Sequence, residues 1–253
     1  MIARIGDNEA EGAHRVGYNG VWSLTTRDDA DNVFVPSYAG LNFEHIFDGH
    51  VWERDRLFEP RRAPMTLRPV AENEVELHQP PTPFWGLESW TRFKLVAPHF
   101  IDLSFRCVPR KMSYRHGYVG LFWASYINAP ENKSLYFWGR RDDEEAPRFH
   151  QFCTPYHNHE STVVHENEPP PPLATTPPVP PWLFTNYSRL RFSEPLMFGR
   201  WRDRVLGVMF DRTAGIRLAH SPSGGSATPD GRDTNPAWDW QFIIRGCELN
   251  TAP

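Results

Sequence analysis

The chain has 253 residues, 40% of them hydrophobic and 14% aromatic, which is enough apolar material for one large core. Its formal net charge is only -4, with basic and acidic residues interspersed, and this excludes the basic surface that nucleic-acid-binding proteins present to phosphates. No segment approaches the roughly 18 consecutive apolar residues of a membrane-spanning helix. We therefore expect a soluble protein with no nucleic-acid or membrane partner, cytoplasmic or, if a signal peptide has been removed, exported.

The cysteines and basic residues narrow the chemistry further. Cys107, Cys153 and Cys247 are widely spaced and odd in number, so neither a disulfide framework nor a thiolate zinc site is indicated. Lysine is rare beside arginine. A GC-rich genome is one explanation, but arginine also suits bidentate recognition of carboxylates, which leaves an acidic ligand open.

The first segment with concentrated polar chemistry is GLNFEHIFDGH, residues 40–50. Strand alternation places Asn42 and Glu44 on one face and Phe43 and His45 on the other. A histidine beside a carboxylate is typical of general acid/base catalysis, because both groups can exchange protons near neutral pH. Glu44 and His45 are therefore predicted catalytic residues, with ordinary surface polarity at a strand end as the alternative.

A series of strands follows, over residues 84–96, 99–110, 114–128 and 134–140. In the third of them, apolar side chains such as Val119 alternate with polar and aromatic ones, so one face is predicted to be core. The other face, together with the matching faces of its neighbours, is either plainly solvated or a ligand groove. The groove interpretation makes His116 catalytic and predicts these substrate-binding residues: Arg106, Tyr118, Tyr126, Tyr136, Trp138 and Arg140.

After a further strand at 148–154, the segment YHNHESTVVHE spans residues 156–166. On a strand, His157 and His159 would project from the same face at a spacing that suits two ligands of one metal, with His165 or a glutamate as a third. Glu160 directly follows His159, which departs from the spacing of cupin-type metal sites. We therefore expect no required cofactor, with a divalent metal ion at these histidines as the minority alternative.

The proline-rich stretch 167–182 cannot join a central strand and is predicted to be a surface loop. Beyond it, residues 190–199, 204–212, 215–221 and 238–244 predict further strands, and Asp211 ends one of them as either a site residue or a turn initiator. About ten strands with turn-rich links predict an all-β fold. We expect a two-sheet antiparallel β-sandwich, jelly-roll-like, forming a single domain over residues 1–253.

The segments GYVGLFWASYINAP, RVLGVMFDR, HSPSGG and NPAWDWQFII resemble bacterial carbohydrate-active jelly-roll and super-sandwich proteins, of the concanavalin-like or galactose-mutarotase-like groups. The resemblance covers the central and C-terminal half and lies in strand texture. It implies a carbohydrate ligand and His/carboxylate chemistry, although the ExDxE strand motif of concanavalin-like glucanases is absent from the sequence.

Together these patterns predict a carbohydrate-active enzyme, a glycoside hydrolase or polysaccharide lyase, that uses His/carboxylate acid-base chemistry in an aromatic- and Arg-lined groove. Its predicted catalytic residues are His45, Glu44, His116 and Asp211. Two alternatives remain: a glycan-binding sandwich without catalysis, and a cupin-like metal-dependent isomerase or oxygenase built on the histidine cluster.

Overall fold

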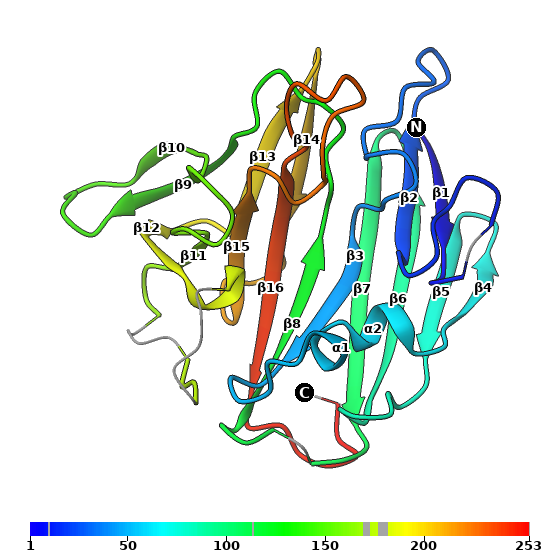
Figure 1. Cartoon of the computed structure of the whole chain (residues 1–253), viewed down its shortest axis with the longest axis vertical. Coiled ribbons are helices and arrows are strands. Elements are labelled where there is room, and N and C mark those ends of the chain that lie inside the picture. The colour runs from blue at the N-terminus through cyan, green and yellow to red at the C-terminus, as the bar shows by residue number, and fades with distance from the viewer. Residues whose placement is uncertain (10, 113, 169–172, 177–181, 253) are drawn as a thin grey trace.

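The structure is a computed structural model, and it describes residues 1–9, 11–112, 114–168, 173–176 and 182–252 (Figure 1). Strands dominate it, so the prediction of a mainly β protein is confirmed. The α-helices described are two single-turn segments, α1 (Arg54–Leu57) and α2 (Glu59–Arg62). The strands lie at β1 Ile2–Gly6, β2 Gly20–Thr25, β3 Asn42–Phe47, β4 Thr66–Ala71, β5 Glu74–Gln79, β6 Leu87–Val96, β7 Phe100–Pro109, β8 Tyr118–Ala124, β9 Leu135–Arg141, β10 Arg148–Phe152, β11 Thr162–His165, β12 Tyr187–Phe192, β13 Leu196–Trp201, β14 Arg204–Met209, β15 Ile216–Ser221 and β16 Ala237–Arg245.

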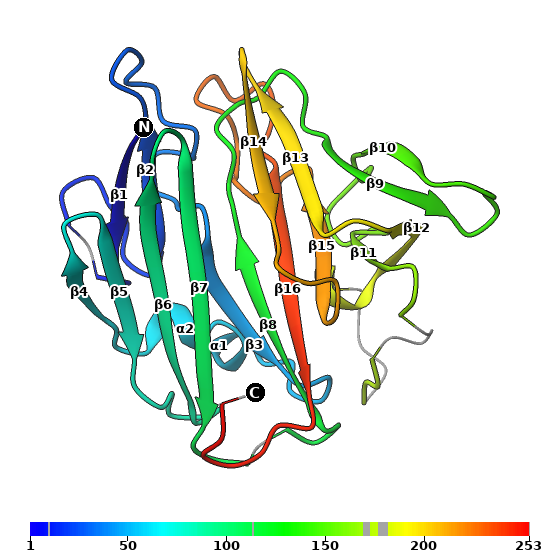
Figure 2. The same cartoon turned by 180° about the vertical axis from the view of Figure 1, so that it is seen from behind.

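The described strands form three sheets, where the sequence predicted two. The largest has ten strands in the order β14-β13-β9-β12-β11-β15-β16-β8-β3, with β10 added beside β9. A four-stranded sheet, β4-β5-β6-β7, and a two-stranded sheet, β1-β2, complete the molecule. Figures 1 and 2 show the four-stranded sheet lying alongside the β3–β8–β16 end of the large sheet. Pairing is antiparallel except between β11 and β12 among the described strands.

The main hydrophobic core lies between the large sheet and the four-stranded sheet. Trp123 of β8 is fully buried there, stacked on Trp240 at a ring-centroid distance of 4.1 Å. Phe105 of β7 reaches it from the other sheet, 4.8 Å from Trp123 and 5.4 Å from Phe43. Val119, Leu121 and Ile127 also lie in this core, so the predicted apolar face of residues 114–128 is confirmed.

The opposite face of β8 is also buried, which corrects the expectation of an open surface. Tyr118 and Phe122 are each only 1% exposed, within a second apolar cluster. A single turn of 3-10 helix, η1 (Leu183–Thr185), covers this cluster, because Phe184 stacks on Phe47 at 4.3 Å and 15°. We call this side of the large sheet, which α1, α2 and η1 cover, the second face.

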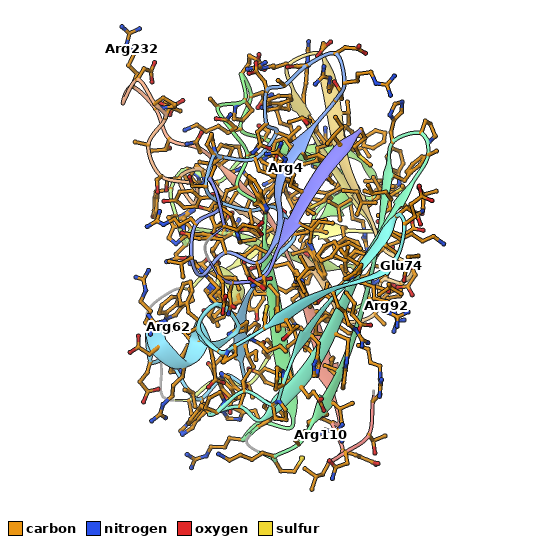
Figure 3. All side chains as sticks on the ribbon, turned by 90° about the vertical axis from the view of Figure 1, so that its right-hand side faces the viewer. Arg4, Arg62, Glu74, Arg92, Arg110 and Arg232 are labelled. Carbon is orange, nitrogen blue, oxygen red and sulfur yellow. The ribbon has the colours of Figure 1, made fainter. Side chains whose placement is uncertain are left out.

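The four-stranded sheet is held on its outer side by charge pairs that cross the strands. Glu76 of β5 accepts hydrogen bonds from Arg68 of β4 at 2.9 Å and from Arg92 of β6 at 2.6 Å. Figure 3 shows Glu74 and Arg92 near one another on this sheet, where their charged groups lie 3.6 Å apart. The outer side of this sheet is therefore a wet, charged face.

None of the helices that the structure describes is long and apolar enough to cross a membrane. Much of the predicted proline-rich loop, at 169–172 and 177–181, lies outside the described residues. Its described part at 173–176 packs on the turn after β3, where Thr176 N donates to Gly49 O at 2.8 Å.

Candidate functional site

A bulge in β3 brings Glu44 and His45 together. The pairing of β3 with β8 shifts between Phe43 and His45, so Glu44 is an extra residue in its strand. The expected alternation is therefore wrong at this point, and both side chains turn to the second face. His45 Nε2 lies 2.6 Å from Glu44 Oε1 as a result.

Glu44 is buried but surrounded by donors. Its Oε2 accepts hydrogen bonds from Asn42 Nδ2 at 3.2 Å, from Arg61 Nη1 at 3.3 Å and from the Tyr126 hydroxyl. His45 supplies a fourth donor at Oε1. The pKa of Glu44 is raised overall, because burial outweighs the Arg61 charge and the Tyr126 hydrogen bond, which act in the opposite direction. Four converging donors fit the ionised carboxylate, which only accepts hydrogen bonds.

His45 lies in an aromatic environment, 4.1 Å from the Phe58 ring and 5.0 Å from the Phe122 ring. Burial, with added repulsion from Arg61 and Arg54, lowers its pKa to about 3. The ring is therefore neutral at neutral pH and donates from Nε2, while no described residue hydrogen-bonds its Nδ1. This environment favours a positioning role for His45 over the predicted acid/base role.

Arg61 joins the Glu44 site to a group of tyrosines. Its Nε donates to Gly17 O at 2.6 Å, and its guanidinium lies 3.7 Å above the centre of the Tyr18 ring. The Tyr18 ring in turn contacts Tyr38 at 4.6 Å and Tyr126 at 5.9 Å. We refer to Arg15, Tyr18, Tyr38, Arg61 and Tyr126 as the tyrosine–arginine cluster.

Tyr38 is the member of this cluster whose hydroxyl reaches solvent. Arg15 Nη1 donates to that hydroxyl at 2.9 Å, and Ser226 Oγ lies 3.0 Å from it. Partial burial raises the pKa of Tyr38, but hydrogen bonds with Ser226 and Arg15 and the Arg15 charge outweigh it and lower the pKa overall. Burial instead raises the pKa of Tyr18 and of Tyr126. Tyr38 is thus better able to act as a base than these two neighbours.

A second buried carboxyl group, Asp239 of β16, lies within electrostatic range of Glu44. Its Oδ1 accepts a hydrogen bond from Ser125 N at 3.1 Å. Burial raises its pKa well above the usual value, and the Glu44 charge raises it further. Burial thus raises the pKa of both carboxyl groups, and Glu44 has side-chain donors that oppose the shift.

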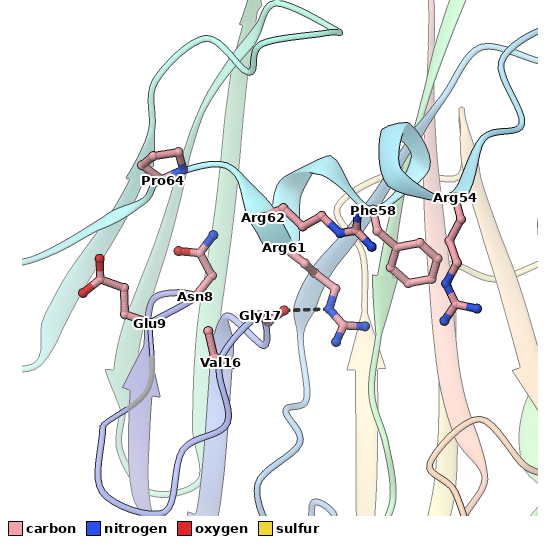
Figure 4. Close-up of a pocket in the computed structure, with 9 residues that line it drawn as sticks. All are labelled: Asn8, Glu9, Val16, Gly17, Arg54, Phe58, Arg61, Arg62 and Pro64. Carbon is pink, nitrogen blue, oxygen red and sulfur yellow. Dashed lines mark hydrogen bonds between the residues drawn. The ribbon is translucent and has the colours of Figure 1, made fainter.

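An open pocket adjoins the cluster on the side of α1 and α2. It has a volume of about 560 Å³, and we call it the arginine pocket (Figure 4). Its lining consists of Asn8, Glu9, Val16, Gly17, Arg54, Phe58, Arg61, Arg62 and Pro64. Arg61 belongs to both sites, because it lines the pocket and also donates to Glu44.

Three of the predicted groove residues do lie near one another or near this site. Tyr126 binds Glu44 directly, and Tyr118 lies on the same second face. The Tyr118 hydroxyl, however, donates to Ala174 O at 2.8 Å, and His116 Nε2 lies 2.9 Å from Thr176 Oγ1. The loop at 173–176 therefore occupies the space over Tyr118 and His116 where the sequence predicted a groove.

The other predicted groove residues lie elsewhere. Arg106 is on β7 of the four-stranded sheet, with its guanidinium 4.6 Å from the centre of the Trp90 ring. Tyr136, Trp138 and Arg140 are on β9, which four strands separate from β8 in the large sheet. The three strands expected to share one face thus contribute to different surfaces, because sequence neighbours are not sheet neighbours here. The β9 surface is aromatic nevertheless, with Trp138 4.9 Å from Phe149.

The histidine segment at 156–166 is mostly a turn. Positive φ angles of 63° at Asn158 and 45° at Glu160 break the strand, so the shared face predicted for the His-X-His pair does not form. His157 Nδ1 lies 2.7 Å from Ser221 Oγ, and the His159 ring lies 4.5 Å from the Tyr156 ring.

His165 ends β11, where its Nδ1 accepts a hydrogen bond from Asn167 N at 3.2 Å. Among the residues that the structure describes, no group of three or more His, Cys, Asp or Glu side chains is arranged to hold a metal. Asp211, the remaining predicted site residue, is exposed and pairs with its neighbour Arg212 at 3.0 Å.

Sequence reasoning missed Arg15, Tyr18, Tyr38, Arg61 and Asp239. Tyr18 and Tyr38 lie in loops before β2 and β3, outside any periodic pattern, and Asp239 stands in an apolar strand. The segment RDRLFEPRR, residues 54–62, could have indicated Arg61, because four arginines lie close in sequence to one aromatic residue.

Comparison of the chain with protein-family models, with curated proteins and with solved structures finds no match in any of the three. The resemblance to carbohydrate-active proteins therefore stays a prediction, and functional inference depends on the geometry of the site.

Proposed function

We propose that this protein is a carbohydrate-active enzyme that cleaves an acidic glycan by β-elimination, with Tyr38 as the base. The observation that carries the proposal is the solvent-facing Tyr38 hydroxyl held between Arg15 Nη1 at 2.9 Å and Ser226 Oγ at 3.0 Å. A lyase needs a base for the C5 proton of a uronic acid and a cation that stabilises the charge developing on its carboxylate. Tyr38 and Arg15 supply these two groups from adjacent positions.

In this reaction the Tyr38 phenolate takes the proton from C5. The electron pair of the broken C–H bond forms a C4=C5 double bond, and the C4–O glycosidic bond breaks. The leaving oxygen takes a proton from water. Ser226 and Arg15 lower the pKa of Tyr38, and in the proposed reaction Arg15 also stabilises the uronate carboxylate, so one cation serves both requirements.

The rings of the tyrosine–arginine cluster support a saccharide ligand. Tyr18, Tyr38 and Tyr126 contact one another at 4.6 to 5.9 Å, and aromatic rings next to charged donors suit the apolar face and the hydroxyl rim of a sugar. The ligand is therefore proposed to be a carbohydrate, with no cofactor required. We also propose that the ten-stranded and four-stranded sheets form a jelly-roll-like sandwich.

Hydrolysis is the second candidate, favoured by the carboxyl pair. Glycoside hydrolases use one carboxyl group that carries a proton and one that is ionised. Burial raises the pKa of Asp239 well above its usual value, and the pKa of Glu44 is also raised, although the donors around Glu44 oppose that shift. In this alternative Asp239 is the general acid and Glu44 the base or nucleophile.

The two reactions give different products, so one panel of acidic and neutral oligosaccharides tests both. β-Elimination produces an unsaturated uronate, seen by its ultraviolet absorbance, whereas hydrolysis produces reducing ends without that absorbance. We expect Tyr38→Phe to lower kcat by about 100-fold or more with KM nearly unchanged, because the variant keeps the ring but loses the proton acceptor.

Tyr156→Phe is the matched control. Tyr156 is exposed, it is far from Tyr38 in the sequence, and its ring contacts His159. Full turnover in Tyr38→Phe, or no unsaturated product from the wild type on any acidic glycan, would overturn the lyase proposal. Reducing ends that form without the unsaturated product, and that disappear in Asp239→Asn, would establish hydrolysis in its place.

A further inference from the structure

Arg54 lines the arginine pocket, and its charge acts on Glu44 without a direct hydrogen bond or ion pair between them. Its guanidinium lies 5.0 Å from the centre of the Phe58 ring, and no residue that the structure describes forms a hydrogen bond or ion pair with it. The neighbouring Arg56 differs, because it pairs with Glu53 and lies over Phe84 outside the pocket. An unpaired arginine at a cavity wall retains its full capacity to bind a carboxylate.

The other charged side chains of the pocket also bear on whether it binds a carboxylate. Arg54, Arg61 and Arg62 line it together with one acid, Glu9, and Arg61 also pairs with Glu44 outside the lining, so Arg54 is the cation of the lining without a direct ion pair among the described residues. Arg62 is partly neutralised outside the lining by its ion pair with Asp55. The pocket therefore favours an anion over a neutral or cationic ligand.

Phe58 gives the pocket a flat apolar wall. The guanidinium groups of Arg54 and Arg61 lie 5.0 and 5.4 Å from the centre of its ring, and Figure 4 shows the ring between these two side chains. A ring flanked by two cations matches a ligand that has an apolar face and a charged edge. A pyranose ring that carries a carboxylate has this shape.

We infer that the arginine pocket is a binding subsite for the carboxylate of a second acidic sugar, next to the sugar held at Tyr38. The nature of the ligand as a saccharide rests on the proposed function. The two positions are joined by residues 15–18, which run from Arg15 through the pocket-lining Val16 and Gly17 to Tyr18. The substrate class is therefore a glycan with acidic groups on successive residues, such as a polyuronate.

Binding is measured by calorimetry on the whole protein, with a galacturonic acid trimer as the probe and a galactose trimer of the same linkage as its neutral counterpart. We expect the acidic trimer to bind more tightly, with an affinity that falls as salt is added. We expect Arg54→Ala to weaken its binding roughly 10- to 100-fold, because a charge-assisted hydrogen bond is lost. Arg56→Ala, the same change on the same exposed helical turn, should leave binding within about twofold.

Equal binding of the acidic and neutral trimers, or equal effects of Arg54→Ala and Arg56→Ala, would overturn the inference. Inorganic sulfate competing as well as the acidic trimer would also overturn it, by reducing the pocket to a general anion site. The proposed function fails separately: Arg54-dependent binding without any cleavage refutes the enzyme but keeps the subsite. Cleavage with an unchanged KM in Arg54→Ala refutes the subsite but keeps the enzyme.

Discussion

At the scale of single residues, the site depends on how charge is stabilised away from water. Glu44 is buried, yet hydrogen bonds from Asn42, His45, Arg61 and Tyr126 replace the solvent it has lost. A buried carboxylate without such partners would be costly, whereas a fully hydrogen-bonded one is tolerated. His45 completes this set as a donor, and burial lowers its pKa to about 3.

This low pKa predicts a dependence of stability on acid. The His45 imidazole has a pKa of about 3 in the folded protein and 6.5 as the ordinary value, so between these values the unfolded chain binds a proton that the folded chain does not. The contribution of His45 to the free energy of unfolding is therefore greatest above about pH 6.5. It falls as the pH decreases toward 3, by on the order of a few kcal/mol.

Urea unfolding at a series of pH values measures how the free energy of unfolding depends on pH. His45→Gln should weaken this dependence, because a glutamine does not titrate. His220, whose pKa burial lowers to about 4, stays in both proteins and so cancels in the comparison. NMR of the His45 ring should show no titration near pH 6.5. A ring that titrates there would contradict the neutral-donor assignment.

At the scale of elements, η1 and the loop at 173–176 decide which surface of the large sheet is accessible. Phe184 is fully buried, stacked between Phe47 at 4.3 Å and Trp52 at 5.9 Å. Gly49 permits the close approach of the loop: its φ is +77°, and a Cβ there would lie 2.3 Å from Ala174 O. These contacts close the space over Tyr118, whereas Tyr38 of the tyrosine–arginine cluster stays partly exposed.

Phe184→Ala should therefore lower the free energy of unfolding by about 3 to 5 kcal/mol, because it removes a buried ring and leaves a cavity. Phe149→Ala is the matched control. Phe149 is 57% exposed on β10, and its removal should change the stability by less than about 1 kcal/mol. Chemical denaturation of both variants measures the difference, and similar losses in the two would mean that Phe184 does not anchor η1.

At the scale of the whole molecule, a single core joins the ten-stranded and four-stranded sheets. Trp123 contacts Phe43 and Trp240 within the large sheet and Phe105 of the four-stranded sheet, at 4.9, 4.1 and 4.8 Å. Neither sheet could keep these rings from water alone. The two sheets should therefore fold as one cooperative unit.

Calorimetry should consequently give one unfolding transition. Trp123→Ala should keep a single transition but lower its midpoint temperature, with a loss of about 3 to 5 kcal/mol in the free energy of unfolding. Trp90→Ala provides a comparison, because Trp90 lies half-buried on the outer side of β6 against His78 and Arg106. We expect a smaller loss in that variant. Two separate transitions in Trp123→Ala would show that the sheets unfold independently.

The sequence by itself determined several central and C-terminal strands and, outside the bulge at Glu44, the alternation within them, because side-chain direction along a strand is a local property of the backbone. It did not predict β1, β2, β4 or β5. Each end of β7 and β9 lies within one residue of the strands expected at 99–110 and 134–140. Val119 and Tyr118 lie in different apolar clusters, on opposite faces of β8, as expected. Glu44 and Tyr126 were also identified from the sequence as candidate residues.

Only the tertiary structure decided which strands share a surface and what covers it. The bulge that unites Glu44 with His45 depends on pairing with β8, and Arg15, Tyr38 and Arg61 meet only when two loops and α2 pack together. Such contacts join segments far apart in the chain, and local periodicity carries no information about them. For that reason the sequence predicted an open groove, whereas the site proposed from the structure is the tyrosine–arginine cluster beside the arginine pocket.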